Sequence, residues 1–89
     1  MKVIVFGGSG FLGSHVADAI TEAGHNVKVY DIIKSEYLKP TQQMIVGDIL
    51  DEQRIRDAMI GCDVVYNFAG IADIDEALTK PIETVRYNI

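Results

Sequence analysis

Short hydrophobic runs alternate along the chain with longer amphipathic runs, and this alternation predicts its secondary structure. Residues 2–6, KVIVF, form a β-branched run that glycines follow, which is typical of a buried strand. Further strands are expected at 27–31, 44–47 and 63–68. Hydrophobic residues recur at helical spacing over 11–23 and 51–60, so each of these segments is predicted to be a helix.

The ends of these elements carry their own signals. Gly24 stands where a helix C-cap belongs, Asp51 is a suitable N-cap, and Gly61 ends the second helix. The polar segment 34–43 contains a proline and is expected to be a loop or a short helix. Beyond the fourth strand, the hydrophobic spacing predicts a helical turn or two at 74–78, then a helix through 82–89 with Pro81 in its first turn.

Strands that alternate with helices indicate βαβ units and a parallel sheet. With right-handed crossovers and a central first strand, the spatial order is 3-2-1-4. The predicted fold class is therefore α/β: the first half of a Rossmann-like, doubly wound parallel sheet. Its fourth strand would be an uncovered edge, which is unusual for a parallel sheet. We therefore expect residues 1–89 to be a truncated portion of a longer protein.

Composition narrows the possible partners. A length of 89 residues allows one domain, and a hydrophobic content of 48% is ample for a core. The net charge of −5, with scattered basic residues, argues against nucleic acid. No apolar run is long enough for a membrane span, and because Met1 leads directly into the first strand, no targeting segment is expected. The single cysteine, Cys62, fits a reducing cytoplasm, and no cluster has metal-ligand spacing.

A glycine-rich turn joins the first strand to the first helix. It can be read as Gly7-x-x-Gly10-x-x-Gly13 or with Gly8 in place of Gly7. In either reading, glycine lets the main chain turn sharply and approach a pyrophosphate, to which the helix N-terminus offers free N–H groups. The alternative is a glycine-rich turn without a ligand.

An acidic residue ends the second strand, as a dinucleotide site requires. Asp31 lies 18 residues beyond Gly13, where a ribose-reading carboxylate is expected. A carboxylate accepts hydrogen bonds from the ribose hydroxyls of adenosine and repels a 2′-phosphate, and no arginine follows at Ile32 or Ile33. NAD is thus favoured over NADP. The alternative for Asp31 is a simple turn residue at the end of a strand.

These elements together resemble the extended short-chain dehydrogenase/reductase family, the NAD-dependent epimerases and dehydratases. GGSGFLGSHVADAITEAGHNVKVYD resembles the family's opening, and VGDILDEQRIRDAMIGCDVVYNFAG its third and fourth strands. The resemblance implies that Asp48 and Ile49 contact adenine and that the segment 68–70 approaches the central riboses. The motif and the resemblance together define these cofactor-binding positions: Gly7, Gly10, Phe11, Leu12, Gly13, Asp31, Ile32, Asp48, Ile49, Phe68, Ala69 and Gly70.

Other features bear on the sub-family. NFAG followed by KP resembles the UDP-galactose 4-epimerase-like members most, and Asn88 matches the family's recurring asparagine. Asn67 stands where family members often carry histidine, which leaves the sub-family open. The alternative for Asn67 is a strand-end residue that satisfies the backbone of its neighbours.

The resemblance also implies where catalysis occurs. In the family, a tyrosine and a lysine four residues later act with a serine or threonine, after the fifth strand. The one Tyr-x-x-x-Lys match here is Tyr30 to Lys34, YDIIK, which we attribute to chance because it lies at the adenosine end of the site. No catalytic residue is therefore assigned, and whether the chain alone is an enzyme stays open.

The expected function is that of the NAD-binding N-terminal portion of an epimerase or dehydratase. Such an enzyme acts on a nucleotide-linked sugar by transient hydride transfer. A non-catalytic NAD(P)-sensing or regulatory module is the alternative. The chain is also expected to self-associate through its exposed edge strand or its terminal helix. His15, His25 and the acidic patch at 73–76 are expected to be ordinary surface or structural residues rather than a site.

Overall fold

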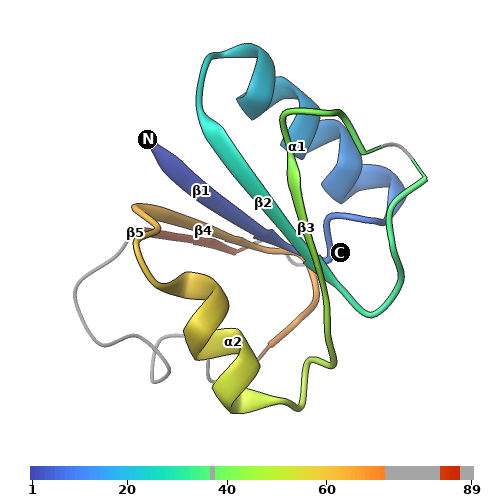
Figure 1. Cartoon of the computed structure of the whole chain (residues 1–89), viewed down its shortest axis with the longest axis vertical. Helices are drawn as coiled ribbons and strands as arrows, with labels where there is room; N and C mark the ends of the chain where they lie inside the picture. The colour runs from blue at the N-terminus through green and yellow to red at the C-terminus, as the bar shows by residue number, and fades with distance from the viewer. Residues whose placement is uncertain (37, 72–82, 87–89) are drawn as a thin grey trace.

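A five-stranded parallel sheet forms the centre of the molecule (Figure 1). In the computed structural model, the described residues are 1–36, 38–71 and 83–86. The strands are β1 (Lys2–Phe6), β2 (Asn26–Asp31), β3 (Gln43–Val46), β4 (Val64–Asn67) and β5 (Glu83–Arg86). Their order is β3-β2-β1-β4-β5, and every neighbouring pair is parallel. The predicted Rossmann-like order 3-2-1-4 is thus confirmed.

Two helices cover opposite faces of the sheet, as Figure 1 shows: α1 (Phe11–Glu22) and α2 (Glu52–Met59). Because side chains alternate along a strand, β1 supplies both faces. Ile4 and Phe6 pack with Ile55 and Met59 of α2, whereas Val3 and Val5 belong to the cluster on the α1 face. This two-sided burial explains why β1 reads as a continuous hydrophobic run.

The predicted helix ends are confirmed. The Asp51 side chain accepts a hydrogen bond from the main-chain N–H of Arg54 at 3.1 Å and so caps α2. Gly24 and Gly61 follow the two helices with positive φ angles of 94° and 80°, the conformation that glycine adopts without strain. In the segment 34–43, the described residues before Gln43 form a loop rather than a short helix. Gln43 begins β3, which begins and ends one residue before the predicted strand.

The helix predicted over 82–89 is wrong where the structure describes it, because Glu83–Arg86 forms β5. This strand pairs in parallel with β4, with Val64 opposite Glu83 and Asn67 opposite Arg86. A short stretch such as ETVR fits both periodicities, so pairing with the free edge of β4 decides between them. β4 is therefore not the uncovered edge that the sequence predicted; the edges of the described sheet are β3 and β5.

Some predictions fall outside the described residues. These are the helical turn at 74–78, the acidic patch at 73–76, Pro81 and Asn88. Within the described part of the chain, no helix is long and apolar enough to cross a membrane. The same part holds no group of three or more histidine, cysteine or acidic side chains arranged to bind a metal ion.

Candidate functional site: the carboxyl edge of the sheet

The glycine turn lies at the carboxyl edge of the sheet, between β1 and α1. The N–H of Gly7 donates to the carbonyl of Tyr30 at 2.8 Å, and that of Gly10 donates back to the carbonyl of Gly7 at 3.3 Å. Gly7 has a φ of 80°, and an added Cβ would lie 3.0 Å from main-chain atoms of Phe68 and Ala69. The fold itself therefore requires glycine at position 7.

Gly13 is also required by packing, because α1 begins directly over the turn. A Cβ on Gly13 would lie 2.9 Å from the Cα of Gly8 and 3.0 Å from the carbonyl carbon of Gly7. A side chain there would push α1 away from the strand that precedes it. Gly8 is restricted in the same way, since its Cβ would collide with Val29 on β2.

Gly10 differs from the other three glycines. Its φ of −73° and ψ of 170° suit any residue, it is exposed, and an added Cβ would meet only the carbonyl of Gly7 at an ordinary 3.5 Å. No contact within the described structure therefore demands glycine at position 10. Close approach of something outside the chain would demand it, so this residue fits a cradle for a ligand.

The N-terminus of α1 is prepared for an anion. Its N-cap, Gly10, makes no side-chain cap, and the first turn contains no acidic residue. The first main-chain bond of the helix runs from Ser14 to Gly10 at 2.9 Å, which leaves the N–H groups of Phe11, Leu12 and Gly13 ahead of it. Together with the helix dipole, these groups favour a negatively charged ligand such as a pyrophosphate.

Asp31 ends β2 beside this turn. Its Oδ2 accepts a hydrogen bond from the main-chain N–H of Ser9 at 3.0 Å, and its Oδ1 lies 3.4 Å from the N–H of Ile33. The side chain is half-buried, so part of the carboxylate faces solvent. A carboxylate has about four acceptor positions, so two remain for ribose hydroxyls.

The residues predicted to surround adenine follow β3 at the same edge. Asp48 and Ile49 are both exposed, and the Asp48 carbonyl accepts a hydrogen bond from the Tyr30 hydroxyl at 2.8 Å. The N–H of Gly47 donates to the Asp31 carbonyl at 2.9 Å, which joins this segment to the end of β2. Asp48 and Asp31 are thus brought to neighbouring strand ends.

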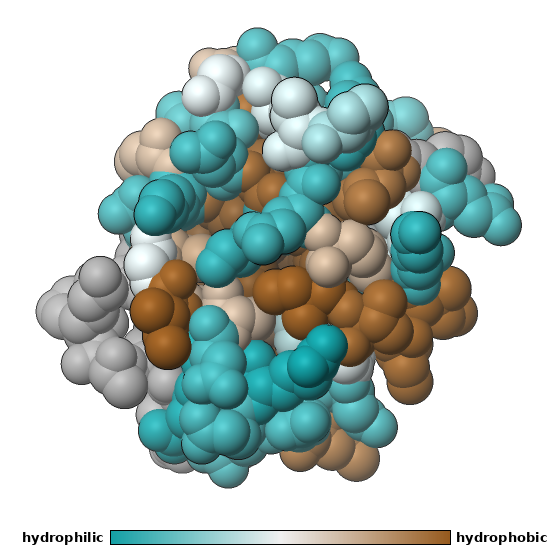
Figure 2. All heavy atoms as spheres, in the orientation of Figure 1, coloured by the Kyte–Doolittle hydropathy of each residue, from teal (hydrophilic) through white to brown (hydrophobic). Residues whose placement is uncertain are grey.

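Hydrophobic side chains are exposed along this edge. In Figure 2 a hydrophobic band runs from the middle of the visible face toward its lower right, the region of β3 and of the segment after β2 in Figure 1. The exposed hydrophobic residues here lie at the start of α1, directly after β2, or at and after the end of β3. They are Phe11, Ile32, Ile33, Val46, Ile49 and Leu50. Exposed apolar surface of this kind, next to polar acceptors, suits the flat ring of an adenine.

The segment after β4 completes the site. The N–H of Phe68 donates to the Phe6 carbonyl at 2.9 Å, and Phe68 and Ala69 lie against Gly7. Gly70 is exposed, has a φ of 70°, and has no atom within 4 Å of an added Cβ. The structure therefore gathers every predicted cofactor-binding residue at one edge, because parallel strands all point their carboxyl ends the same way.

Asn67 acts as a strand-end residue, as one of its two interpretations predicted. Its Nδ2 donates to the Ile71 carbonyl at 2.9 Å, and the Ile71 N–H donates back to its Oδ1 at 3.3 Å. The side chain is 4% exposed. It fixes the turn that carries Phe68, Ala69 and Gly70.

The rejected Tyr-x-x-x-Lys match is indeed structural. Tyr30 is fully buried between the sheet and α2, and its hydroxyl is occupied by Asp48. Burial, followed by the negative charges of Asp51 and Asp48, raises the pKa of Tyr30, while Arg54 opposes the shift. Tyr30 therefore stays protonated and supports the site from the core, through its hydrogen bond to the Asp48 carbonyl.

Sequence reasoning missed Ser9 and Tyr30 as supports of the site. Ser9 lies inside the glycine motif, but its hydrogen-bond partners are more than twenty residues away. Nothing in the local pattern marks it. Tyr30 was considered only as part of a catalytic pair.

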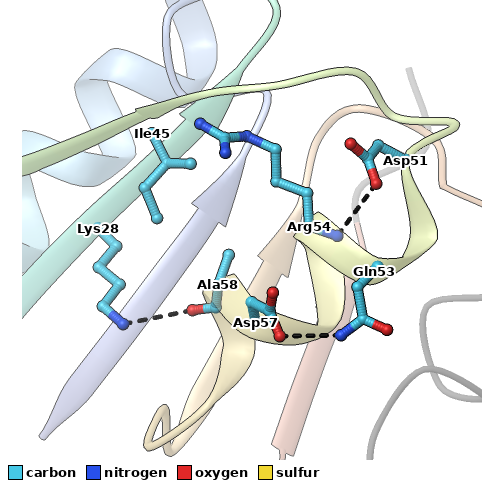
Figure 3. A pocket seen from close by; sticks show the side chains of 7 residues that line it. All are labelled: Lys28, Ile45, Asp51, Gln53, Arg54, Asp57 and Ala58. Atoms are coloured by element: carbon cyan, nitrogen blue, oxygen red, sulfur yellow. Dashed lines mark hydrogen bonds between the residues drawn. The ribbon is translucent and has the colours of Figure 1, made fainter.

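A separate hollow lies between β2, β3 and α2 (Figure 3). Its polar groups already bind one another or the main chain: Gln53 donates to Asp57, the Arg54 N–H donates to Asp51, and Lys28 donates to the Ala58 carbonyl. This hollow is lined by none of the glycine-turn residues. It is not part of the candidate site.

Comparison with known proteins identifies the class to which this fold and site belong. The model of the NAD dependent epimerase/dehydratase family matches residues 3–89, and the chain belongs to that family. The expected family is thus confirmed, and its dependence on NAD agrees with the cofactor predicted from Asp31.

Individual relatives include UDP-glucose 4-epimerase of Klebsiella pneumoniae, 32% identical over 101 residues that cover all of this chain and 73% of that protein. A sterol-4-alpha-carboxylate 3-dehydrogenase of Mus musculus is 37% identical over 76% of this chain. UDP-glucose 4-epimerase of Thermotoga maritima superposes with a TM-score of 0.72 at 32% identity, over 81% of this chain. The Brucella ovis enzyme in complex with NAD gives 0.70 at 33% identity, over 76% of this chain.

The chain spans only part of most of these proteins. It covers 20% of the 3-beta-hydroxysteroid dehydrogenase of Mycolicibacterium neoaurum, 18% of the mouse protein and 25% of the Thermotoga structure. The relatives' names also come from both sugar and steroid chemistry. The relatives' names therefore do not agree on one substrate class.

Proposed function

We propose that the chain binds NAD at the carboxyl edge of its sheet. The pyrophosphate contacts the main-chain N–H groups that open α1, the adenosine ribose hydroxyls bind Asp31, and the adenine lies beside Asp48 and Ile49. The observation that carries this proposal is Gly10. Glycine occupies that position although no contact in the described structure excludes a side chain there.

NAD rather than NADP is proposed on electrostatic grounds. The Asp31 carboxylate is held by the Ser9 N–H. A 2′-phosphate on a ribose bound to it would lie beside this negative charge, and no arginine that could neutralise the phosphate stands at position 32 or 33. A second negative charge beside this carboxylate is unfavourable in a half-buried site. The NAD complexes among the solved relatives support the same choice.

For the whole protein we propose a reaction on a nucleotide-linked sugar, because several relatives are UDP-glucose 4-epimerases. Bound nicotinamide would supply the hydride acceptor. The residues of this chain would hold the adenosine and pyrophosphate portions of the cofactor. We also propose that the protein works in the cytoplasm, consistent with one cysteine, buried as a thiol.

Calorimetric titration of the chain with NAD and NADP tests the binding. NAD should bind more tightly than NADP, and Gly10→Ala should weaken NAD by about tenfold, because an added methyl group displaces the pyrophosphate from the main chain. Gly10→Ala should unfold at the wild-type temperature, since its Cβ has room in the unliganded chain. Equal affinity of wild type and Gly10→Ala for NAD contradicts the proposed site.

We also propose self-association, at the β3 edge rather than at the fourth strand expected from the sequence, because β4 is paired with β5. β3 is an edge of the described sheet, and Val46 at its end is 46% exposed. A free strand edge with an exposed hydrophobic residue can pair with the same edge of a second copy. The terminal helix predicted over 82–89 lies partly outside the described residues, and its described residues, 83–86, form β5.

A further inference from the structure

Ser9 ties the glycine turn to the segment that leaves β2. Its main-chain N–H donates to Asp31 Oδ2 at 3.0 Å, and its hydroxyl donates to the Ile33 carbonyl at 2.6 Å. The same hydroxyl lies 4.0 Å from the sulfur of Met44, a far weaker acceptor. Two bonds from one residue therefore connect the turn to both the carboxylate and the main chain beyond it.

The two residues that follow Asp31 are not held by burial of their side chains. Ile32 and Ile33 are 61% and 68% exposed, so burial of their side chains does not fix the main chain. Ile33 in turn approaches Asp31 Oδ1 with its N–H at 3.4 Å. The Ser9 hydroxyl therefore completes a small ring of contacts, from Ser9 to Ile33 to Asp31 and back to Ser9.

This ring orients the carboxylate. Ser9 occupies one acceptor position on Oδ2, and Ile33 approaches Oδ1, so rotation of the carboxylate is restricted while two acceptor positions stay open. A ligand with two neighbouring hydroxyls gains from such a fixed acceptor pair, because less freedom is lost on binding.

We propose that Ser9 is a positioning residue for recognition of the adenosine ribose. It acts through Asp31 and Ile33 and does not itself contact the reacting part of the cofactor. This inference rests on the proposed function, because it assumes that the ribose binds Asp31. In the sequence motif, Ser9 is only a small residue between two glycines. The inference gives it a role in ligand specificity.

The experiment compares NAD with its analogue lacking the adenosine 2′-hydroxyl, by calorimetry, on wild type and on two variants. Ser9→Ala removes the bond to Ile33, and Ser9→Thr keeps a hydroxyl. Thr21→Ala is the matched control, since the Thr21 hydroxyl also donates to a carbonyl, that of Ala17 at 2.8 Å, but lies in the last turns of α1. Thermal unfolding of each variant is measured alongside.

Ser9→Ala should weaken NAD about 3- to 10-fold, the range expected for one hydrogen bond. The affinity lost on removing the 2′-hydroxyl should be smaller in Ser9→Ala than in wild type, because the Ser9 hydroxyl no longer fixes Ile33, whose N–H approaches Asp31 Oδ1. The main-chain bond from Ser9 to Oδ2 is kept in this variant. Ser9→Thr should restore both values, and Thr21→Ala should leave both unchanged even where it lowers the unfolding temperature.

The inference is overturned if Ser9→Ala loses the same affinity for both ligands, since the loss would then be general rather than directed at the ribose. It is also overturned if Ser9→Ala binds NAD as wild type does. In both cases the proposed function survives if Gly10→Ala still weakens NAD. Absence of NAD binding by wild type overturns the proposed function and this inference together.

Discussion

The hydroxyl of Tyr30, on β2, donates to the main-chain carbonyl of Asp48 at 2.8 Å, and so a fully buried side chain fixes the segment that follows β3. Gly47 makes this contact possible, because an added Cβ at that position would collide with the tyrosine ring and with Arg54. The adenine side of the candidate site is thus supported from the core.

Tyr30→Phe should therefore lower the free energy of unfolding by about 1 kcal/mol, because the Asp48 carbonyl loses its donor. Denaturant unfolding at pH 7 measures this change. Tyr66 is only half-buried, so Tyr66→Phe provides the control and should have a smaller effect. An unchanged stability in Tyr30→Phe would show that the hydrogen bond contributes nothing net.

The same tyrosine should make the protein sensitive to alkali. Its pKa is raised in the folded state, mainly by burial, so the unfolded chain gives up this proton first as the pH rises past its ordinary value of 10.0. The Tyr30 contribution to stability is fully present below that pH and is lost above it. The unfolding free energy should therefore fall less steeply from pH 9 to pH 11 in Tyr30→Phe than in wild type. Denaturant unfolding at several pH values measures this difference.

Substitution by alanine should destabilise the protein at one glycine of the motif and not at another. Gly13→Ala should lower the free energy of unfolding by about 1–3 kcal/mol, because its Cβ is forced against Gly7 and Gly8. Gly10→Ala should leave it within about 0.5 kcal/mol of wild type. Denaturant unfolding without ligand compares them, and similar losses in the two variants would refute the distinction between packing glycine and ligand glycine.

Asp31 should control both affinity and cofactor preference. Asp31→Ala removes the acceptor for the Ser9 N–H and for the ribose, so NAD should weaken by about tenfold or more. Asp31→Asn keeps an oxygen acceptor and removes the charge, so the ratio of NAD to NADP affinity should fall toward one. Titration of both variants with both dinucleotides measures this, and an unchanged ratio in Asp31→Asn would remove Asp31 from the specificity argument.

Asn67 should matter for stability through its paired hydrogen bonds to Ile71. Asn67→Ala loses both bonds in a buried position and should destabilise the protein by about 1–3 kcal/mol. Asn67→Asp keeps the acceptor and loses the donor, so its loss should be smaller at acidic pH, where a protonated carboxyl can again donate. Thermal unfolding at pH 4 and pH 7 tests the order of the variants.

Self-association through β3 should depend on Val46. Val46→Lys places a charge on the exposed end of the edge strand and should shift a concentration-dependent dimer toward monomer. Size-exclusion chromatography with light scattering measures the mass of both proteins. Wild type that stays monomeric at high concentration would contradict the proposed self-association.

Local pattern was sufficient for most of the fold. The continuous run at 2–6, the helical spacing over 11–23 and the caps at Asp51 and Gly24 each reflect a local preference of the chain, and each was predicted. The order 3-2-1-4 followed from the handedness of crossovers, and the convergence of Asp31 and Asp48 followed from the parallel arrangement. These are general constraints that any chain with this pattern obeys.

Only the tertiary structure decided the rest, because it depends on contacts between distant segments. Residues 83–86 have no strong periodicity, and the free edge of β4 makes them a strand. Ser9 and Tyr30 support the site through partners 18 to 24 residues away. The spacing of the glycines was readable in sequence, but which of them serve packing and which leaves room for a ligand depends on the atoms that surround each one in space.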